Sequence, residues 1–182
     1  MTKDTIVLRP GRPADVDAAL EIDDAAFARY ADVGITLDMD DDHPMVQGEK
    51  SAWRRCAQIG GLVFAEVESD GARVGFFALS EIDGAAYLEQ IDVLPTHMRQ
   101  GIGRQLMTEV IAMSRRWGHS DLVLLTCEHV PWNLPYYQRF GFERMGPADI
   151  GAGLAADMTT QARYLPMADR RVAMRKALDA TE

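Results

Sequence analysis

The chain has 182 residues, of which 47% are hydrophobic and 26% are charged, an ordinary composition for a globular protein with a substantial core. Its formal net charge of −9 argues against a nucleic-acid partner, because nucleic-acid binding requires a basic surface. No apolar stretch approaches the roughly 18 residues of a membrane-spanning helix, and no signal peptide is seen. The two cysteines are far apart and lack metal-ligand spacing. We therefore expect no membrane association, no metal and a reducing, cytoplasmic location.

The first half of the chain alternates between strand and helix patterns. The expected elements are a strand at 5–9, helices at 14–29 and 49–59, and strands at 62–68, 73–80 and 86–93. A polar, acidic segment with weak periodicity separates the two helices. Ser69-Asp70-Gly71 and Asp83-Gly84 are typical hairpin turns. Short turns between consecutive strands predict an antiparallel meander.

The second half begins with an amphipathic helix that ends near Gly118. The expected elements are helices at 101–117 and 134–140, and strands at 122–126, 142–145 and 171–178, although the composition of the last also permits a helix. Residues 146–161 are rich in Gly, Ala and Asp, and we expect a long loop there. The order predicts an α+β fold with a mixed sheet, in a single domain covering residues 1–182.

A glycine-containing basic turn links the end of the meander to the amphipathic helix. Val93-Leu94-Pro95 ends the strand pattern, and Arg99-Gln100-Gly101-Ile102-Gly103-Arg104 follows. A helix N-terminus offers unpaired N–H groups and a partial positive charge, so this turn is suited to a phosphate group. A Rossmann fingerprint requires Gly or Ala where Leu106 stands, and the Walker motif is absent. Both nucleotide-binding interpretations therefore fail.

Together with a second motif, this turn resembles the GNAT N-acetyltransferase superfamily. The turn is similar to motif A of that family, and the segment from Pro131 to Phe142, PWNLPYYQRFGF, is similar to motif B. The order of elements from residue 5 to residue 178 also matches. The resemblance implies a three-layer α/β/α fold whose mixed, mostly antiparallel sheet is splayed at an acetyl-CoA site.

The resemblance also assigns residues to acetyl-CoA. The pyrophosphate would lie on Arg99, Gln100, Gly101, Ile102, Gly103 and Arg104. The backbone of Ile91, Asp92 and Val93 would pair with the pantetheine arm as an added strand. The first position of the family pattern falls on Met98 instead of a polar residue, which removes one side-chain contact but leaves the backbone N–H groups.

Acetyl transfer to an amine requires a proton donor for the leaving thiolate. Tyr137 holds the family position for this general acid, four residues before Gly141. A tyrosine hydroxyl is protonated at neutral pH and is therefore able to donate. Asn133 lies one helical turn earlier on the same face, and the resemblance places it at the cofactor.

A general base would remove the proton of the acceptor ammonium. Glu89, on the strand before motif A, is the first candidate, because apolar neighbours raise the pKa of a carboxyl group. Glu128 or a water molecule is the alternative. Strand alternation predicts that Tyr87, Glu89, Ile91 and Val93 share one face of the sheet.

The acidic segment before residue 49 has two interpretations. Asp38, Asp40, Asp42 and Glu49 follow the spacing of a calcium loop, but His43 stands where glycine is required. We therefore interpret the segment as a solvated loop or the rim of an entrance that attracts a cationic amine.

The expected function is direct transfer of acetyl from acetyl-CoA to a primary amine of a small molecule. The alternatives are a non-catalytic acyl-CoA sensor and an enzyme that acetylates protein N-termini or lysines. Because many members of the family pair as dimers, a homodimer is also consistent with the resemblance.

Overall fold

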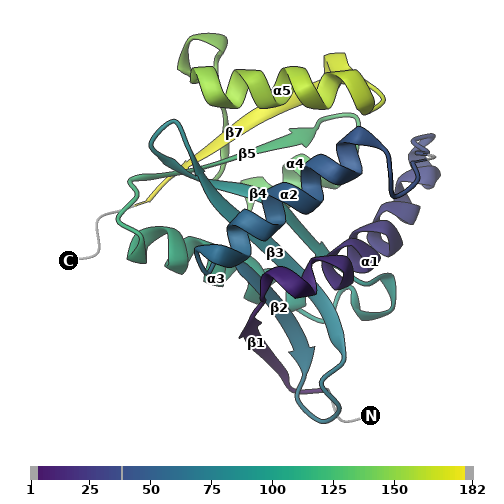
Figure 1. Ribbon diagram of the computed structural model, residues 1–182. Helices are drawn as coiled ribbons and strands as arrows, with labels where there is room; N and C mark the ends of the chain where they lie inside the picture. The colour runs from purple at the N-terminus through teal and green to yellow at the C-terminus, as the bar shows by residue number, and fades with distance from the viewer. Residues whose placement is uncertain (1–3, 38, 179–182) are drawn as a thin grey trace.

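One seven-stranded sheet runs through residues 4–37 and 39–178, the part of the chain that the computed structural model describes (Figure 1). The strand order is β1-β2-β3-β4-β5-β7-β6. The strands are β1 (Ile6–Pro10), β2 (Leu62–Val67), β3 (Arg73–Ile82), β4 (Ala85–Val93), β5 (Asp121–Cys127), β6 (Glu143–Arg144) and β7 (Arg171–Ala177). Only β4 and β5 are parallel, and every other neighbouring pair is antiparallel. The predicted meander and the mixed, mostly antiparallel sheet are confirmed.

Helices cover both faces of this sheet, which gives the predicted three-layer α/β/α arrangement (Figure 1). They are α1 (Val16–Phe27), α2 (Pro44–Gln58), α3 (Ile102–Arg116), α4 (Asn133–Gln138) and α5 (Ala152–Tyr164). The helices α1, α2 and α5 pack on one face, and α3 and α4 pack on the other. Within the described residues, no helix combines the length and the apolar character needed to cross a lipid bilayer.

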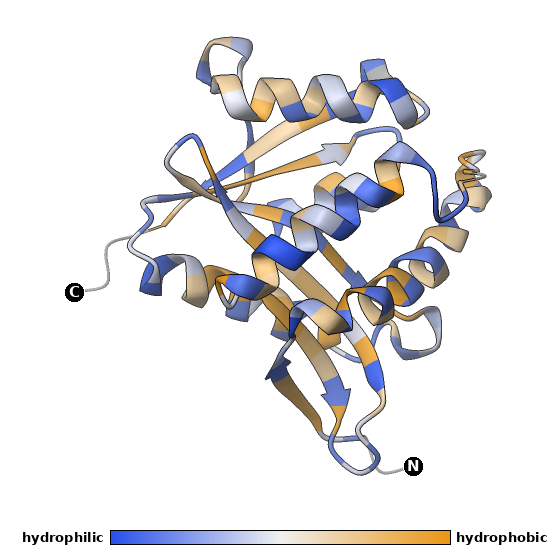
Figure 2. Cartoon of the chain, in the orientation of Figure 1, coloured by the Kyte–Doolittle hydropathy of each residue, from blue (hydrophilic) through white to orange (hydrophobic). Residues whose placement is uncertain are grey.

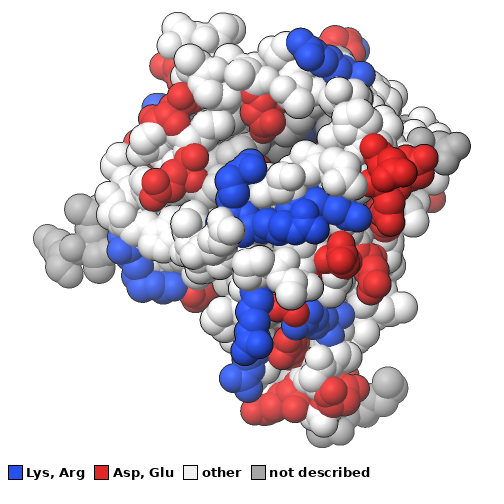
Figure 3. All heavy atoms as spheres, viewed as in Figure 1, with Lys and Arg blue, Asp and Glu red and all other residues white. Residues whose placement is uncertain are grey.

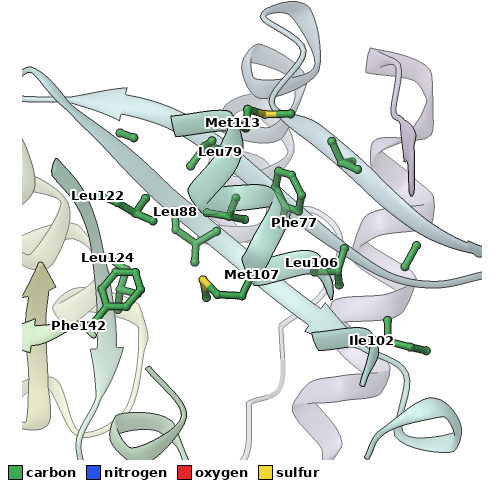
Figure 4. Packing of buried hydrophobic residues seen from close by; sticks show 14 of the residues in the cluster. Phe77, Leu79, Leu88, Ile102, Leu106, Met107, Met113, Leu122, Leu124 and Phe142 are labelled. Atoms are coloured by element: carbon green, nitrogen blue, oxygen red, sulfur yellow. The ribbon is translucent and has the colours of Figure 1, made fainter. Parts of the chain in front are cut away.

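The largest hydrophobic core lies between α3 and the sheet. Leu106 and Met107 of α3 are fully buried and point toward Phe77, Leu88 and Leu122 of three adjacent strands (Figure 4). A second core lies under α1 and α2 around Trp53. Figure 2 shows the same division, because the strands are largely hydrophobic whereas the outward turns of α2 are hydrophilic. Leu88, in the middle of β4, belongs to the core under α3, and the residue after it, Glu89, is the candidate base.

Because of a β-bulge in β4, its side chains do not alternate as predicted. Leu79 of β3 pairs with Leu88, but Ala78 pairs with Gln90, so Glu89 is the extra residue. Tyr87 consequently faces α5, whereas Ile91 and Val93 pack in the α3 core on the opposite face. The prediction that Tyr87, Ile91 and Val93 share one face is wrong, because the extra residue shifts the period of two. The bulge turns Gln90 and Asp92 toward α1.

The helix α5 replaces most of the loop that we predicted for residues 146–161. Its composition is poor in large apolar residues, and only Leu154 of the helix is buried. The helix is fixed from outside its own sequence: the carboxylate of Asp83 accepts hydrogen bonds of 2.9 Å from the N–H groups of Gly153 and Leu154. A capping residue seventy positions earlier leaves no local signal in the segment.

Two other boundaries differ from the prediction. The helix α2 begins at Pro44, five residues before the predicted start at 49, because Pro44 suits the first helical turn and the ring of His43 accepts from the N–H of Met45. The segment 171–178, for which a helix was also permitted, contains the strand β7, which fills the space between β5 and β6.

Candidate active site

The two parallel strands β4 and β5 separate toward their carboxyl ends. They pair from Ala86 with Leu122 to Leu88 with Leu124, and no pairing between them follows. Beyond this point β4 stays paired with β3 as far as Val93, so one edge of residues 89–93 has no strand partner. A cavity of about 420 Å³ lies at this gap. The splayed sheet that the resemblance implies is therefore present, with a free backbone edge at Ile91, Asp92 and Val93.

The N-terminus of α3 follows the end of β4 by nine residues. Arg99 and Gly101 both have positive φ angles, of 61° and 92°, and this conformation turns the chain into the helix. The first N–H groups of α3 have no acceptor within the helix. A Cβ atom at Gly103 would lie 3.1 Å from the hydroxyl of Tyr136, so glycine allows Tyr136 to approach this end of the helix closely. The predicted residues 99–104 thus form a turn suited to an anion, outside the cavity itself.

The short helix α4 carries the candidate acid into the cavity. Tyr137 and Asn133 both line it, which agrees with their predicted common face. The amide of Asn133 donates to the hydroxyl of Tyr30 at 3.4 Å. Tyr136 points the other way and donates to the carbonyl of Gly103 at 2.8 Å, which ties α4 to the start of α3. Burial raises the pKa of Tyr137 well above its ordinary value, so its hydroxyl holds its proton at neutral pH.

Glu89, the bulged residue of β4, lines the same cavity. Its carboxylate accepts a hydrogen bond of 2.6 Å from the hydroxyl of Ser80 on β3. Burial raises the pKa of Glu89, and the nearby charge of Asp157 acts in the same direction, whereas the Ser80 hydroxyl opposes them. A carboxylate with a raised pKa is a stronger base, as this role requires. Ordinary alternation places Glu89 on the same face as Tyr87, and the bulge, which the sequence pattern did not indicate, brings Gln90 and Asp92 to that face as well.

Glu128, the alternative base, lies outside the cavity and forms ion pairs with Arg144 and Arg170. The hydrogen bond from Arg144 lowers its pKa, which makes the carboxylate a weaker base. The structure therefore favours Glu89 over Glu128 on both position and basicity.

An acidic wall on the α1 and α2 side of the cavity was not predicted. The side-chain amide of Gln90 donates to Asp23 of α1 at 2.5 Å and to Asp92 of β4 at 2.7 Å. Burial raises the pKa of both carboxyl groups. Asp23 follows Val16, Ala19 and Leu20 at helical spacing, so a carboxylate within the apolar stripe of α1 was the available signal.

Glu49 of α2 belongs to the same wall. Burial, together with the charge of Asp23, raises its pKa from an ordinary value of 4.5 to about 8. Between these two pH values the folded protein keeps a proton that the unfolded chain has released. Proton binding is then greater in the folded state, so the free energy of unfolding falls as pH rises through this window.

We therefore expect Glu49→Gln to stabilise the protein at pH 9 and to leave its stability nearly unchanged at pH 4.5. After discounting for the partial exposure of Glu49, the gain at pH 9 is about 1–2 kcal/mol. Thermal unfolding at the two pH values measures it, with Glu21→Gln on the exposed surface of α1 as the control. A gain in stability at pH 4.5 alone would contradict a raised pKa of Glu49.

A splayed sheet, a glycine-containing turn before α3 and a tyrosine in the cavity are together the features expected of the N-acetyltransferase class. A sequence profile of the acetyltransferase (GNAT) family matches residues 33–142, more than half of the chain. The chain therefore belongs to this family, as its two motifs indicated.

Solved structures with the same fold have low sequence identity to this chain. The N-acetylglutamate synthase of Neisseria gonorrhoeae has 15% identity and a TM-score of 0.67, over 97% of this chain and 36% of its own length. The PaiA N-acetyltransferase of Thermoplasma acidophilum has 15% identity and a TM-score of 0.67, over 95% and 99%. The ribosomal-protein-S18-alanine N-acetyltransferase of Escherichia coli has 18% identity and a TM-score of 0.66, over 98% and 97%. At such identities these likenesses establish the fold alone.

Proposed function

We propose that this acetyltransferase moves an acetyl group directly from acetyl-CoA to the primary amine of a small molecule. The observation that carries the proposal is the gap between β4 and β5, which meets a cavity lined by Tyr137, Asn133 and Glu89. The N. gonorrhoeae and T. acidophilum neighbours were both crystallised with coenzyme A, which supports CoA as the donor.

The free edge of β4 and the turn before α3 suit the two ends of a CoA molecule. The backbone of Ile91, Asp92 and Val93 is available to pair with the amide groups of the pantetheine arm. The N–H groups at residues 99–104 would bind the pyrophosphate, with Arg99 and Arg104 exposed beside it. Acetyl-CoA supplies an activated thioester carbonyl, so no further group is required for the transfer.

Glu89 and Tyr137 would carry the two proton movements. Glu89, directly or through water, removes a proton from the acceptor ammonium, and the free amine then attacks the carbonyl carbon. A carbon–nitrogen bond forms as the carbon–sulfur bond breaks, and the nitrogen releases its second proton to solvent. Tyr137 gives its hydroxyl proton to the departing sulfur and regains one from solvent. The presence of both residues at one cavity favours an enzyme over a sensor.

Thiol release from acetyl-CoA tests this proposal across small amines and short peptides, with calorimetry to measure CoA binding. We expect CoA to bind and at least one small amine to yield thiol and its N-acetyl product. Binding of CoA without turnover of any acceptor would favour the sensor. Turnover of peptides alone would favour acetylation of proteins, the kind of reaction named for the E. coli neighbour.

A further inference from the structure

Acidic side chains greatly outnumber basic ones in the lining of the cavity at the β4–β5 gap. Six acidic side chains from α1, α2, β4 and the segment before α2 line it: Asp23, Asp24, Asp41, Glu49, Glu89 and Asp92. The one basic side chain among the described lining residues is Arg171 of β7, which donates to Gln161 of α5. Figure 3 shows that acidic groups also gather on the outside, at the right of the view. In the sequence, the exposed residues Asp40, Asp41 and Asp42 directly precede α2.

Some of these carboxylates have partners in the protein, and others do not. Asp41 pairs with Lys50 at 3.4 Å, and Glu89 accepts from Ser80. In residues 4–37 and 39–178, Glu49 has neither an ion pair nor a side-chain hydrogen bond. In the same residues, Arg171 Nε is the one fully buried side-chain nitrogen or oxygen that has no partner. The Glu49 oxygens are therefore not fully buried, and they remain accessible from the cavity that Glu49 lines. Glu49 therefore has room for a cation beside it, and the positive charge of that cation would favour release of the proton that burial lets Glu49 keep.

A metal ion does not fit this arrangement. Among the described residues, no group of three or more His, Cys, Asp or Glu side chains is placed to hold one. The acidic groups instead come from several elements around the cavity, from Glu89 at the bulge of β4 to Glu49 in the first turns of α2. A spread of negative charge of this kind matches a flexible molecule with separated positive charges.

Building on the proposed function, we propose that the acceptor is a linear diamine or polyamine. Its second ammonium group would lie among Glu49, Asp23 and Asp92, while the reacting nitrogen lies beside Glu89 and Tyr137. The reacting ammonium nitrogen loses two protons, one to Glu89 before the attack and one to solvent after it, gains the acetyl carbon and becomes a neutral amide. The thioester sulfur gains one proton, and the distant ammonium keeps its charge throughout. A neutral group at that end of the acceptor would leave the carboxylates uncompensated, and an anionic one would be repelled.

Three acceptors of equal length test the charge requirement: 1,4-diaminobutane, 4-amino-1-butanol and 4-aminobutanoate. From thiol release, we expect kcat/KM for the diamine to exceed that for the alcohol by about 10-fold or more, with the acid slowest. Equal values for the diamine and the alcohol, or a preference for the acid, would overturn the inference.

The variant Glu49→Gln removes the carboxyl group that would become charged beside the bound ammonium, and it keeps the shape of the side chain. We expect kcat/KM for the diamine to fall by about 10-fold while that for the alcohol changes by less than about 2-fold. Glu21→Gln, on the exposed surface of α1 outside the cavity, is the matched control. An equal loss for both acceptors would assign Glu49 a structural role and overturn the inference.

Calorimetry on the CoA-saturated protein separates this inference from the proposed function. Binding of the diamine that depends on Glu49, without turnover of any amine, would contradict the proposed function and support recognition of the dication. Turnover of the alcohol and the diamine at equal rates would support the proposed function and overturn the inference alone.

Discussion

Replacement of Tyr137 by phenylalanine is expected to lower kcat for acetyl transfer by about 100-fold, because it removes the proton donor for the leaving sulfur. The ring of Tyr137 packs edge-on against Tyr136 and Phe142, at 5.3 and 5.9 Å between centroids. Phenylalanine keeps both contacts, so the fold and the affinity for CoA should be unchanged. Thiol-release kinetics measure the first effect, and calorimetry with CoA measures the second.

The matched control is Tyr164→Phe, which removes the same atom from α5. Tyr164 contacts His43 edge-on and does not line the cavity. We expect this variant to retain kcat within about 2-fold, as is usual for a surface substitution. If Tyr137→Phe also stayed within that range, Tyr137 would be removed from the mechanism and Tyr30, the other tyrosine of the cavity, would become the next candidate.

The parts of the fold that were predictable carry their signals locally. The turns at Ser69-Asp70-Gly71 and Asp83-Gly84 indicated the meander. Gly118, with a φ of 84°, follows the end of α3 as expected. The apolar run of β5 indicated a buried strand, and Leu122 to Leu124 are buried. Each of these features depends on a few neighbouring residues.

The features that were missed depend on contacts between distant residues. The cap that Asp83 provides for α5 joins positions seventy apart. The bulge at Glu89 is a property of the pairing between β3 and β4, and it exists in neither strand alone. The acidic wall joins Asp23, Glu49 and Asp92 from three elements, and only their packing makes it one surface. The sequence motifs therefore predict residues for acetyl-CoA, whereas the surface that would face the amine is seen only in the folded structure.

Gly61 is also packed against distant residues, so we expect its replacement to lower the stability of the protein strongly. A Cβ atom there would lie 2.0 Å from the carbonyl oxygen of Leu79 and 2.9 Å from the ring of Trp117. The backbone of Gly61 is fixed from both sides, because its N–H donates to Cys56 and its carbonyl accepts from Leu79. Leu79 is also where the register shifts opposite Glu89. Any displacement at Gly61 is therefore transmitted to the bulge.

We expect Gly61→Ala to lower the free energy of unfolding by about 3 kcal/mol, since an overpacked backbone contact has no flexible side chain to move aside. Denaturant unfolding measures this loss. Gly60→Ala, at a neighbouring position with a φ of 79° and open space around it, should cost only about 1–2 kcal/mol. Gly48→Ala in α2, also in open space, should stabilise the protein by about 1 kcal/mol.

The free energies of unfolding of these three alanine variants show whether the loss at Gly61 comes from its contact with Leu79 or from replacement of any glycine. If Gly61→Ala were no more destabilising than Gly60→Ala, the contact between Gly61 and Leu79 of β3 would be too loose to support the bulge. Because the bulge orients Glu89, a folded Gly61→Ala protein should also show a lower kcat with unchanged affinity for CoA. Loss of stability without that drop in kcat would mean that Glu89 holds its position independently of Gly61.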